Sequence, residues 1–312
     1  MAGDKFNYVK GTATDPSQRL RFGCYQFWKG DTLIEAGVFF DPSLPSAERE
    51  LLVAFTRSHG LNWMTKAAFV DDVFYGLAYD LRATIVGFNL PFDLSRLAVR
   101  HGPARGKTRG GFSFQLSEDT RKARVQVKHI SGRASLIQFA ALRKRRDTKG
   151  ERKKQDRVPV RRGSFVDVKT IAAALLSRSF SLASLADFLK TQTRKASTDQ
   201  HGGPLSHDYL GYAVQDVQAT WECFCVLSGR FETHGLSMTP LSRILSEASI
   251  GKAYLKQMNI RPWQELQPDA PKELNGLILS LFLAAGWKCT LAGKFTKCSI
   301  ATSCPCIRLS AR

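Results

Sequence analysis

Residues 84–98 constrain the fold of this chain more than any other stretch. A β-branched run ends at Gly87, and an apolar-periodic pattern typical of a helix follows at once. Asn89 and Asp93 lie at this junction, four residues apart around Pro91. A strand that leads into a helix presents polar side chains at its carboxyl end, where α/β proteins keep their chemistry. An acidic residue in the first turn of a helix also stabilises that helix, because its charge faces the positive end of the helix dipole. The stretch alone therefore leaves two roles open for Asp93, a functional-site residue or a residue that caps the helix.

A second motif lies in a long helical pattern over residues 207–234. Tyr212 and Asp216 are four residues apart there, so they share one face of the helix. The same spacing fits a surface pair or a hydrogen bond at the edge of the core. The pair therefore gains functional meaning only together with Asn89 and Asp93.

The positive charge of the chain is concentrated in one segment. The net charge is +19, and residues 100–162 contain 20 Lys or Arg against 5 Asp or Glu. A one-sided basic segment is the expected footprint of a polyanion partner, and no amphipathic apolar face accompanies it as a membrane surface would require. We expect nucleic acid as the partner, with a solvated loop as the alternative. The densest cluster consists of Arg143, Lys144, Arg145, Arg146, Arg152, Lys153 and Lys154.

Length and composition limit the class of protein. The 312 residues, 43% of them hydrophobic, allow one large or two ordinary globular domains. The start of the chain lacks the apolar region of a signal peptide, and the longest apolar run, 277–286, is too short to span a bilayer. We expect a soluble cytoplasmic protein with no membrane partner. The last four cysteines lack the spacing of a zinc site.

The order of elements indicates an α/β fold with a mixed sheet. Within residues 103–163, alternating stretches predict hairpins, and residues 144–157 read as a loop. The expected strands are 5–10, 19–28, 32–40, 84–88 and 165–168. The expected helices are 45–60, 69–82, 92–101, 169–177, 181–189, 207–234 and 240–258.

Together, these motifs resemble the DEDDy branch of the DEDD 3′–5′ exonuclease superfamily. Asn89-x-x-x-Asp93 is similar to its second motif and Tyr212-x-x-x-Asp216 to its third. The sequence around these motifs resembles the proofreading exonuclease region of family B DNA polymerases, over roughly residues 5–265. Further stretches in the expected order are "FVDVKTIA", "SLASLADFL" and "LSEASIGKAYLKQMNI".

The resemblance implies a fold and a domain organisation. The fold would be ribonuclease-H-like, a mixed sheet flanked by helices, with a basic hairpin and loop insertion at 103–163. Residues 1–235 would form the exonuclease-like domain. Residues 236–279 would be a helical connector toward a polymerase domain, which a full-length relative would contain, and residues 280–312 an atypical tail.

The resemblance also implies a chemistry, phosphodiester hydrolysis with two Mg²⁺ or Mn²⁺ ions at a single-stranded DNA 3′ end. Hard divalent cations take carboxylate oxygens as ligands. By resemblance, Asp93 and Asp216 would be metal ligands, Tyr212 would orient the attacking water, and Asn89 would support the site or the substrate strand. Asp167, at a strand end, would lie behind the site or serve as an ordinary helix cap.

The first motif departs from the family pattern. The family has Asp and Glu two residues apart on its first strand, where this chain has Asn7 and Val9. With two of four carboxylates absent, both metals should bind weakly, and we expect little or no exonuclease activity. The alternatives are a non-catalytic nucleic-acid-binding module and a degraded polymerase gene product.

The tail departs as well, because the composition shifts toward Cys, Thr, Ser and Lys after about Leu279. One choice of codons for residues 301–308, read from the third base, encodes Asp-Phe-Leu-Ser-Met-Tyr-Pro, which resembles a metal-binding motif of family B polymerases. We therefore hypothesise a shift of reading frame near residue 280. A genuine short C-terminal appendage is the alternative.

Overall fold

The computed structural model describes residues 20–140, 162–193 and 204–269, followed by 271, 273–274, 276–277 and 280–281. The chain divides into two compact units, residues 1–257 and 258–312. All strands of the described residues lie in the first unit. No helix within these residues is long and apolar enough to cross a membrane.

The first sheet has three strands in the order β1-β2-β3. β1 (Phe22–Lys29) and β2 (Thr32–Phe40) form an antiparallel hairpin, and β3 (Asn62–Thr65) runs parallel to β2 on its other side. The hairpin turns at Gly30, whose φ of 59° lies in the left-handed region that glycine tolerates. β3 is therefore an edge strand of this sheet among the described residues.

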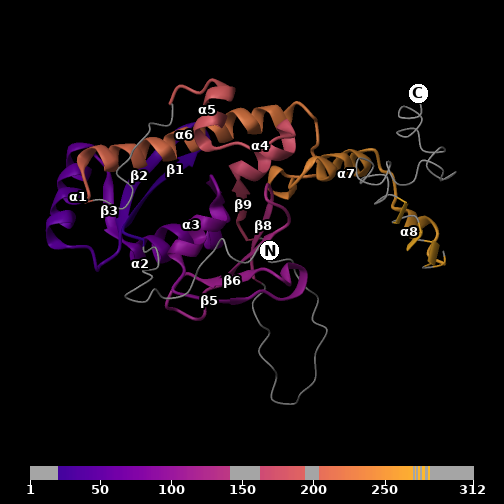
Figure 1. Ribbon diagram of the computed structural model, residues 1–312, viewed down its shortest axis with the longest axis horizontal. Coiled ribbons are helices and arrows are strands. Elements are labelled where there is room, and N and C mark those ends of the chain that lie inside the picture. Colours follow the sequence, from indigo (N-terminus) through magenta and orange to yellow (C-terminus); the bar gives the residue numbers. More distant parts are fainter. Residues whose placement is uncertain are drawn as a thin grey trace, which may run out of the picture. The chain divides into compact units, whose positions relative to one another are not determined.

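Both faces of the first sheet are covered. On one face Val38 and Phe40 pack in a core with α1 (Ser46–Ser58) and α6 (His207–Glu232). On the other face Tyr25 and Phe39 join the core around η1, a π-helical segment at Phe69–Asp80. The alternation of faces along β2 follows from the period of two residues in a strand. Figure 1 shows α6 running along β1 and β2.

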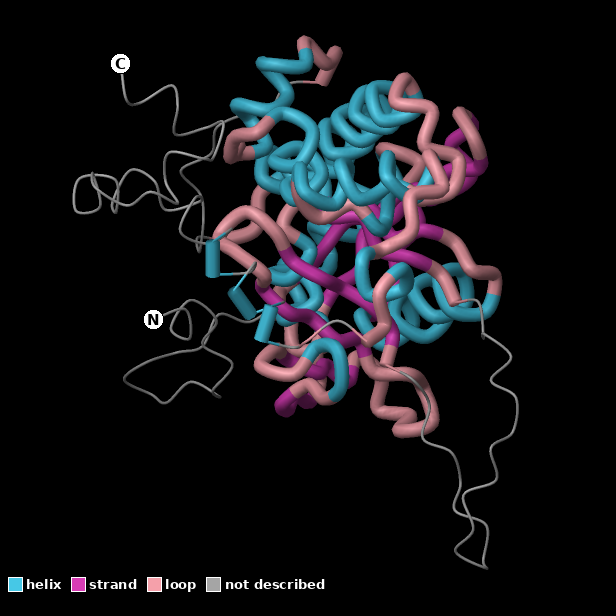
Figure 2. The backbone as a smooth tube through the Cα atoms, turned by 90° about the vertical axis from the view of Figure 1, so that its right-hand side faces the viewer, coloured by secondary structure: helices cyan, strands magenta, loops and turns pink. Residues whose placement is uncertain are grey.

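The second sheet pairs two strands that are far apart in the chain. β4 (Thr84–Gly87) is parallel to β9 (Ser164–Asp167). Ile85 and Phe165 join the same core as Tyr25, whereas Val86 and Val166 pack with the core that includes part of α6. The two sheets therefore lie between the same helical layers, and Figure 2 shows strands in the interior of the first unit with helices on both sides.

The third sheet is an antiparallel meander that begins just before the expected basic insertion and continues into it. Its order is β5-β6-β7-β8, and Phe114, Val125 and Val127 point into the core. Its bounds are Arg100–Pro103, Phe112–Gln115, Val125–His129 and Ser135–Phe139.

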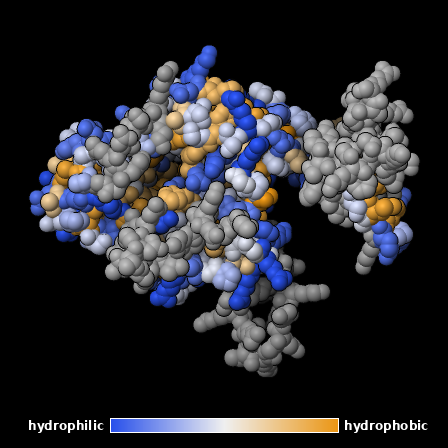
Figure 3. All heavy atoms as spheres, in the orientation of Figure 1, coloured by the Kyte–Doolittle hydropathy of each residue, from blue (hydrophilic) through white to orange (hydrophobic). Residues whose placement is uncertain are grey.

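The remaining helices complete the two units. The first unit also contains α2 (Lys66–Ala68), α3 (Leu90–Leu97), η2 (Gly106–Thr108), α4 (Val168–Leu176), α5 (Leu182–Leu189), η3 (Leu241–Arg243) and α7 (Glu247–Gln257). The second unit contains α8 (Trp263–Leu266). Hydrophobic residues are visible at the surface near α5, which carries the exposed Phe188 (Figure 3).

The α/β class predicted from the sequence is confirmed, with differences in detail. The helix expected over 92–101 ends at Leu97, because Val99 donates its N–H to Gln115 O at 2.8 Å and the chain continues as β5. The described strands form three sheets where one mixed sheet was expected. The expected helix at 240–258 is divided into η3 and α7. The strand expected at 5–10 and the loop expected at 144–157 lie outside the described residues.

Candidate functional site

The junction between β4 and α3 is tight. A Cβ at Gly87 would lie 2.5 Å from Leu90 Cδ2, so a larger residue at this position would force the Leu90 side chain to move. Asn89 turns the chain with a left-handed φ of 64°, a conformation that Asn adopts more readily than most residues. Asp93 Oδ2 lies 3.9 Å from the same Cβ position, so the carboxylate points back toward the end of β4.

Asp167, the last residue of β9, ties the two strand ends together. Its Oδ1 accepts hydrogen bonds from the backbone N–H groups of Asn89 at 2.7 Å and Leu90 at 3.2 Å. Its Oδ2 accepts one from Thr170 Oγ1 at 2.7 Å. Asp167 occupies the N-cap position of α4, yet its side chain satisfies the otherwise unpaired N–H groups at the start of α3. It therefore supports the loop that carries Asn89, which is one of the two roles considered from the sequence.

The surroundings of Asp93 disfavour its charge. Burial among protein atoms is the main cause, and the charge of Asp167 the second, and together they raise the pKa of Asp93 to about 7. Solvent still reaches the side of Asp93 that faces away from β4 and β9, because the residue as a whole is exposed. The pKa of Asp167 is raised as well, by burial, although its hydrogen bonds from Thr170, Leu90 and Asn89 oppose the shift. Burial therefore disfavours ionisation of both carboxyl groups, and the charge of Asp167 adds to this effect for Asp93.

Tyr212 and Asp216 lie on α6, and α6 packs on β1. Gln26 Nε2 donates to Gln218 Oε1 at 3.0 Å, and the rings of Trp28 and Trp221 stack 4.8 Å apart. Burial, and then the charge of Asp216, raise the pKa of the Cys24 thiol on β1 to about 12. Asp216 is therefore directed toward the first sheet and is not one half of a solvent-exposed pair.

Tyr212 has a different neighbour. Its ring stacks on the ring of Tyr209 with 6.1 Å between centroids, and Tyr209 in turn makes an edge contact with Phe22 at 5.6 Å. Tyr212 is half-buried, so the contact leaves part of the side chain accessible to a ligand.

The structure brings some of the predicted site residues together and not others. Asn89 and Asp93 share the ends of β4 and β9 with Asp167, and α6, which carries Tyr212 and Asp216, packs against both β1 and β4. Within the described ranges, no group of three or more His, Cys, Asp or Glu side chains is placed to hold a metal ion. The first-motif positions and the basic cluster lie outside the described residues: Asn7, Val9, Arg143, Lys144, Arg145, Arg146, Arg152, Lys153 and Lys154.

The donor set fits a metal only in part. Asp93 and Asp216 supply the carboxylate oxygens that Mg²⁺ and Mn²⁺ prefer, and a cation beside Asp93 would offset the charge of Asp167. A two-metal centre needs more oxygen ligands than these two side chains provide. The described residues therefore do not fit the two-metal arrangement.

The structure adds two residues that sequence reasoning missed. Thr170 donates to Asp167 and accepts a hydrogen bond from the backbone N–H of Ser135, 3.3 Å away on β8. Ser135 Oγ is also 2.9 Å from His129 Nδ1. A Thr three residues after an Asp at a helix start was a visible signal, but the link to β8 depends on the tertiary fold.

Comparison with known proteins adds no relative. No protein-family model matches the chain, and neither curated proteins nor solved structures give a match. The function therefore has to be argued from the residues and their arrangement.

Proposed function

We propose that the chain is an exonuclease-type domain that binds the 3′ end of single-stranded DNA and has lost most of its hydrolytic capacity. One observation carries the proposal: the Asp93 carboxylate is held at the carboxyl end of β4, beside Asp167, with a pKa raised to about 7. Strongly shifted carboxylates at strand ends mark candidate functional sites. If Asp93 were only an exposed residue in the first turn of α3, the loop before it would not need the hydrogen bonds that Asp167 accepts from Asn89 and Leu90.

The sheet arrangement supports a ribonuclease-H-like fold. Among the described residues, β1 pairs only with β2, and β4 pairs only with β9, so each has an edge without a partner strand. The same helical layers cover both sheets.

The sequence of the first motif is the reason to expect low activity. Asn7 and Val9 replace the carboxylates that would complete the metal site, so Asp93 and Asp216 would bind Mg²⁺ or Mn²⁺ weakly. Tyr212 and Asn89 keep their proposed supporting roles toward water and the substrate strand. Phe92 is 38% exposed beside Asp93, with the Arg96 guanidinium 4.8 Å from its ring centroid, and offers a surface on which a base can stack.

The proposal is tested with single-stranded DNA labelled at its 5′ end. We expect the protein to bind this DNA in the absence of metal. In excess protein with Mn²⁺, we expect shortening from the 3′ end to be very slow or absent. Rapid 3′-directed degradation that Asp216→Ala abolishes would refute the loss of activity, and failure to bind DNA at all would refute the whole proposal.

A second candidate function is a non-catalytic nucleic-acid-binding module. The specific observation in its favour is that the described residues contain no cluster suited to a metal ion. It differs from the first candidate in a single outcome, since no first-motif substitution would then produce hydrolysis. Three predictions stay open: a polymerase domain in a full-length relative, a shift of reading frame near residue 280, and a cytoplasmic location. The gene sequence checks the first two.

A further inference from the structure

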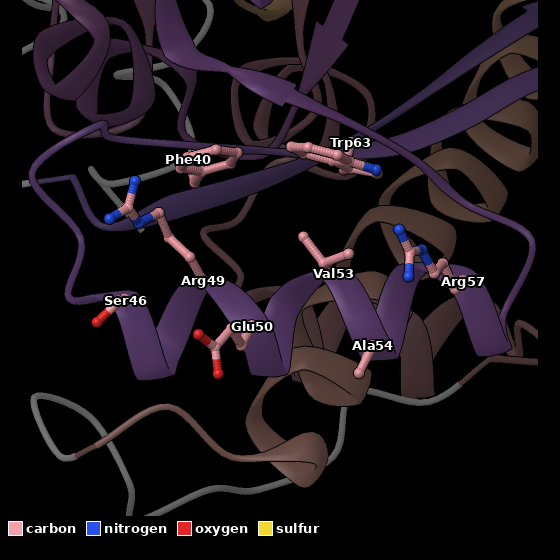
Figure 4. A pocket seen from close by; sticks show the side chains of 8 residues that line it. All are labelled: Phe40, Ser46, Arg49, Glu50, Val53, Ala54, Arg57 and Trp63. Carbon is pink, nitrogen blue, oxygen red and sulfur yellow. The ribbon is translucent and has the colours of Figure 1, made fainter.

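A pocket lies between α1 and the edge of the first sheet, away from the Asp93 region. Its volume is about 470 Å³, within the range of small-molecule sites. Figure 4 shows Phe40 and Trp63 on the sheet side, Val53 on the facing side of α1, and the side chains of Arg49 and Arg57 rising from α1 toward the sheet.

The aromatic side of this pocket is open to solvent. Phe40 is 6% exposed and belongs to the core, whereas Trp63 is 48% exposed. The two rings stack with 6.1 Å between centroids and 27° between their planes. Trp63 comes from β3, the edge strand, so no further strand of the described residues covers it on that side. A large exposed aromatic ring that packs against a second ring offers a face on which a planar ligand can stack.

The two arginines of the pocket also have no salt-bridge partner among the described residues. Arg49 and Arg57 are eight residues apart on α1, which separates their Cα atoms by about 12 Å along the helix. In the part of the chain that the structure describes, neither side chain forms a salt bridge or a hydrogen bond, whereas Arg21 is paired with Glu48 nearby. Figure 4 shows Glu50 pointing away from the aromatic side. Two free guanidinium groups therefore flank an exposed indole.

We propose that this pocket is an accessory binding site for single-stranded polynucleotide, with a base stacked on Trp63 and phosphates bound by Arg49 and Arg57. Two cations about 12 Å apart along the helix suit a chain of phosphates better than one phosphate. Guanidinium groups bind phosphate oxygens in a bidentate manner, and the net charge of +19 favours a polyanion. The inference rests on the proposed function only for the class of ligand.

The position of the pocket agrees with a role beside the candidate site. On the inner side of α1, the ring of Phe55 is 5.8 Å from that of His207, the first residue of α6. Leu205 N–H also donates to Glu48 of α1 at 3.4 Å. α6 continues from this contact to Tyr212 and Asp216. The pocket therefore adjoins the start of the helix that carries the third motif.

The test measures binding of a labelled twelve-nucleotide oligothymidylate by fluorescence anisotropy, with a chelator present so that hydrolysis does not interfere. Trp63→Ala should raise the dissociation constant about fivefold or more, and Trp63→Phe should restore most of the affinity. Arg49→Gln with Arg57→Gln should weaken binding and reduce the slope of log K against log salt by about 1.4, two phosphate contacts at about 0.7 each. Arg261 is an exposed arginine of the second unit, and Arg261→Gln is the matched control. It should change the slope of log K against log salt by no more than about 0.7, the contribution of one phosphate contact, and the dissociation constant by no more than the loss of one such contact would.

Two competitors identify the ligand, an abasic oligonucleotide of the same length and a polyglutamate peptide. We expect the abasic strand to bind wild type less tightly than oligothymidylate, and Trp63→Ala to remove this difference. Equal binding of oligothymidylate by wild type and by the three pocket variants would overturn the inference and leave the proposed function intact. Equal competition by polyglutamate would show a pocket selective for charge alone and would also overturn it. No binding by wild type would instead contradict the proposed function.

Discussion

The Asp93 region and the pocket formed by Arg49, Arg57 and Trp63 differ in how the fold treats charge. Asp93 and Asp167 lie at two strand ends, where burial raises the pKa of both and the charge of Asp167 adds to the shift of Asp93. The arginines of the pocket stand on the solvent side of α1, and their charges have no partner in the described chain. The first region holds carboxyl groups whose ionised forms are disfavoured, whereas the second presents its charges to solvent.

This difference separates two kinds of function. Carboxyl groups with raised pKa values cluster at active sites, and this is why the proposed chemistry is assigned to the Asp93 region. An exposed pair of cations beside an aromatic ring serves binding and can change without loss of the fold. Substitutions in the two regions should accordingly affect different measurements.

The largest expected effect comes from restoring the first motif with Asn7→Asp and Val9→Glu together. Two added carboxylates would complete the oxygen ligands for divalent metal, and even outer contacts of metal sites change activity by about 10–100-fold. We therefore expect hydrolysis of single-stranded DNA to rise at least about 100-fold, measured as release of 3′ nucleotides with Mn²⁺.

The control for this experiment adds Asp216→Asn to the restored protein, which should return hydrolysis to the wild-type level. Adding the Arg49→Gln and Arg57→Gln substitutions instead should slow hydrolysis of long strands and leave trinucleotides unaffected. A restored protein that binds DNA and remains inactive would favour the non-catalytic module.

The next effect concerns the Asp167 anchor. Asp167→Ala leaves the N–H groups of Asn89 and Leu90 without their acceptor, and unsatisfied buried donors cost about 1–3 kcal/mol each. We expect a loss of about 2–4 kcal/mol in the free energy of unfolding, measured by denaturant titration.

Asp167→Asn is the matched variant, because its amide oxygen can still accept from Asn89. It should cost less than Asp167→Ala, and it should also lower the pKa of Asp93 by removing the neighbouring charge. A pocket variant such as Arg49→Gln should change stability by less than about 0.5 kcal/mol. Equal losses for Asp167→Ala and Arg49→Gln would contradict the contrast between the two regions.

The smallest effect is the pH dependence of Asp93. Its pKa is raised from an ordinary 3.8 to about 7 in the folded protein, so its contribution to stability is fully present below pH 3.8 and is lost as pH rises through about 7. Asp93→Asn removes this loss. After allowance for solvent access, we expect the variant to gain about 1 kcal/mol on wild type between pH 4 and pH 8.

Thermal unfolding checks this prediction, with a relative shift in Tm of about 2–4 °C. A gain at pH 4 that disappears at pH 8 would have the wrong sign. Mn²⁺ should stabilise wild type more at pH 8 than at pH 5, because it competes with the proton for Asp93.

Hydrophobic periodicity was enough to predict the larger elements of the fold. The strand expected at residues 32–40 and the helix expected from the apolar stripe of 207–234 are present as β2 and α6 almost unchanged. β3 was missed, because its four residues are too few to show a period and its pairing with β2 is tertiary. η1 was expected as an α-helix, since the same apolar stripe fits both windings; its π character shows in the bond from Leu81 N–H to Gly76 O.

The candidate site was predictable only where its residues are close in sequence. Asn89 with Asp93, and Tyr212 with Asp216, are local patterns, whereas the hydrogen bond from Asn89 N–H to Asp167 joins residues 78 positions apart. The pocket left no signal in the sequence at all, because Trp63 and Arg49 become neighbours only when α1 packs beside β3. Contacts between distant elements decide such sites, and periodicity carries no information about them.

α6 also fixes the distance between the pocket beside α1 and Asp216. It begins beside α1, at His207, and reaches Asp216 nine residues later, a rise of about 14 Å along a single stiff helix. A nucleic acid that touches both the pocket and Asp216 must span at least this interval. The length of the shortest oligonucleotide that binds with full affinity would therefore be set by the register of α6, and would change stepwise if residues were inserted into its first turns.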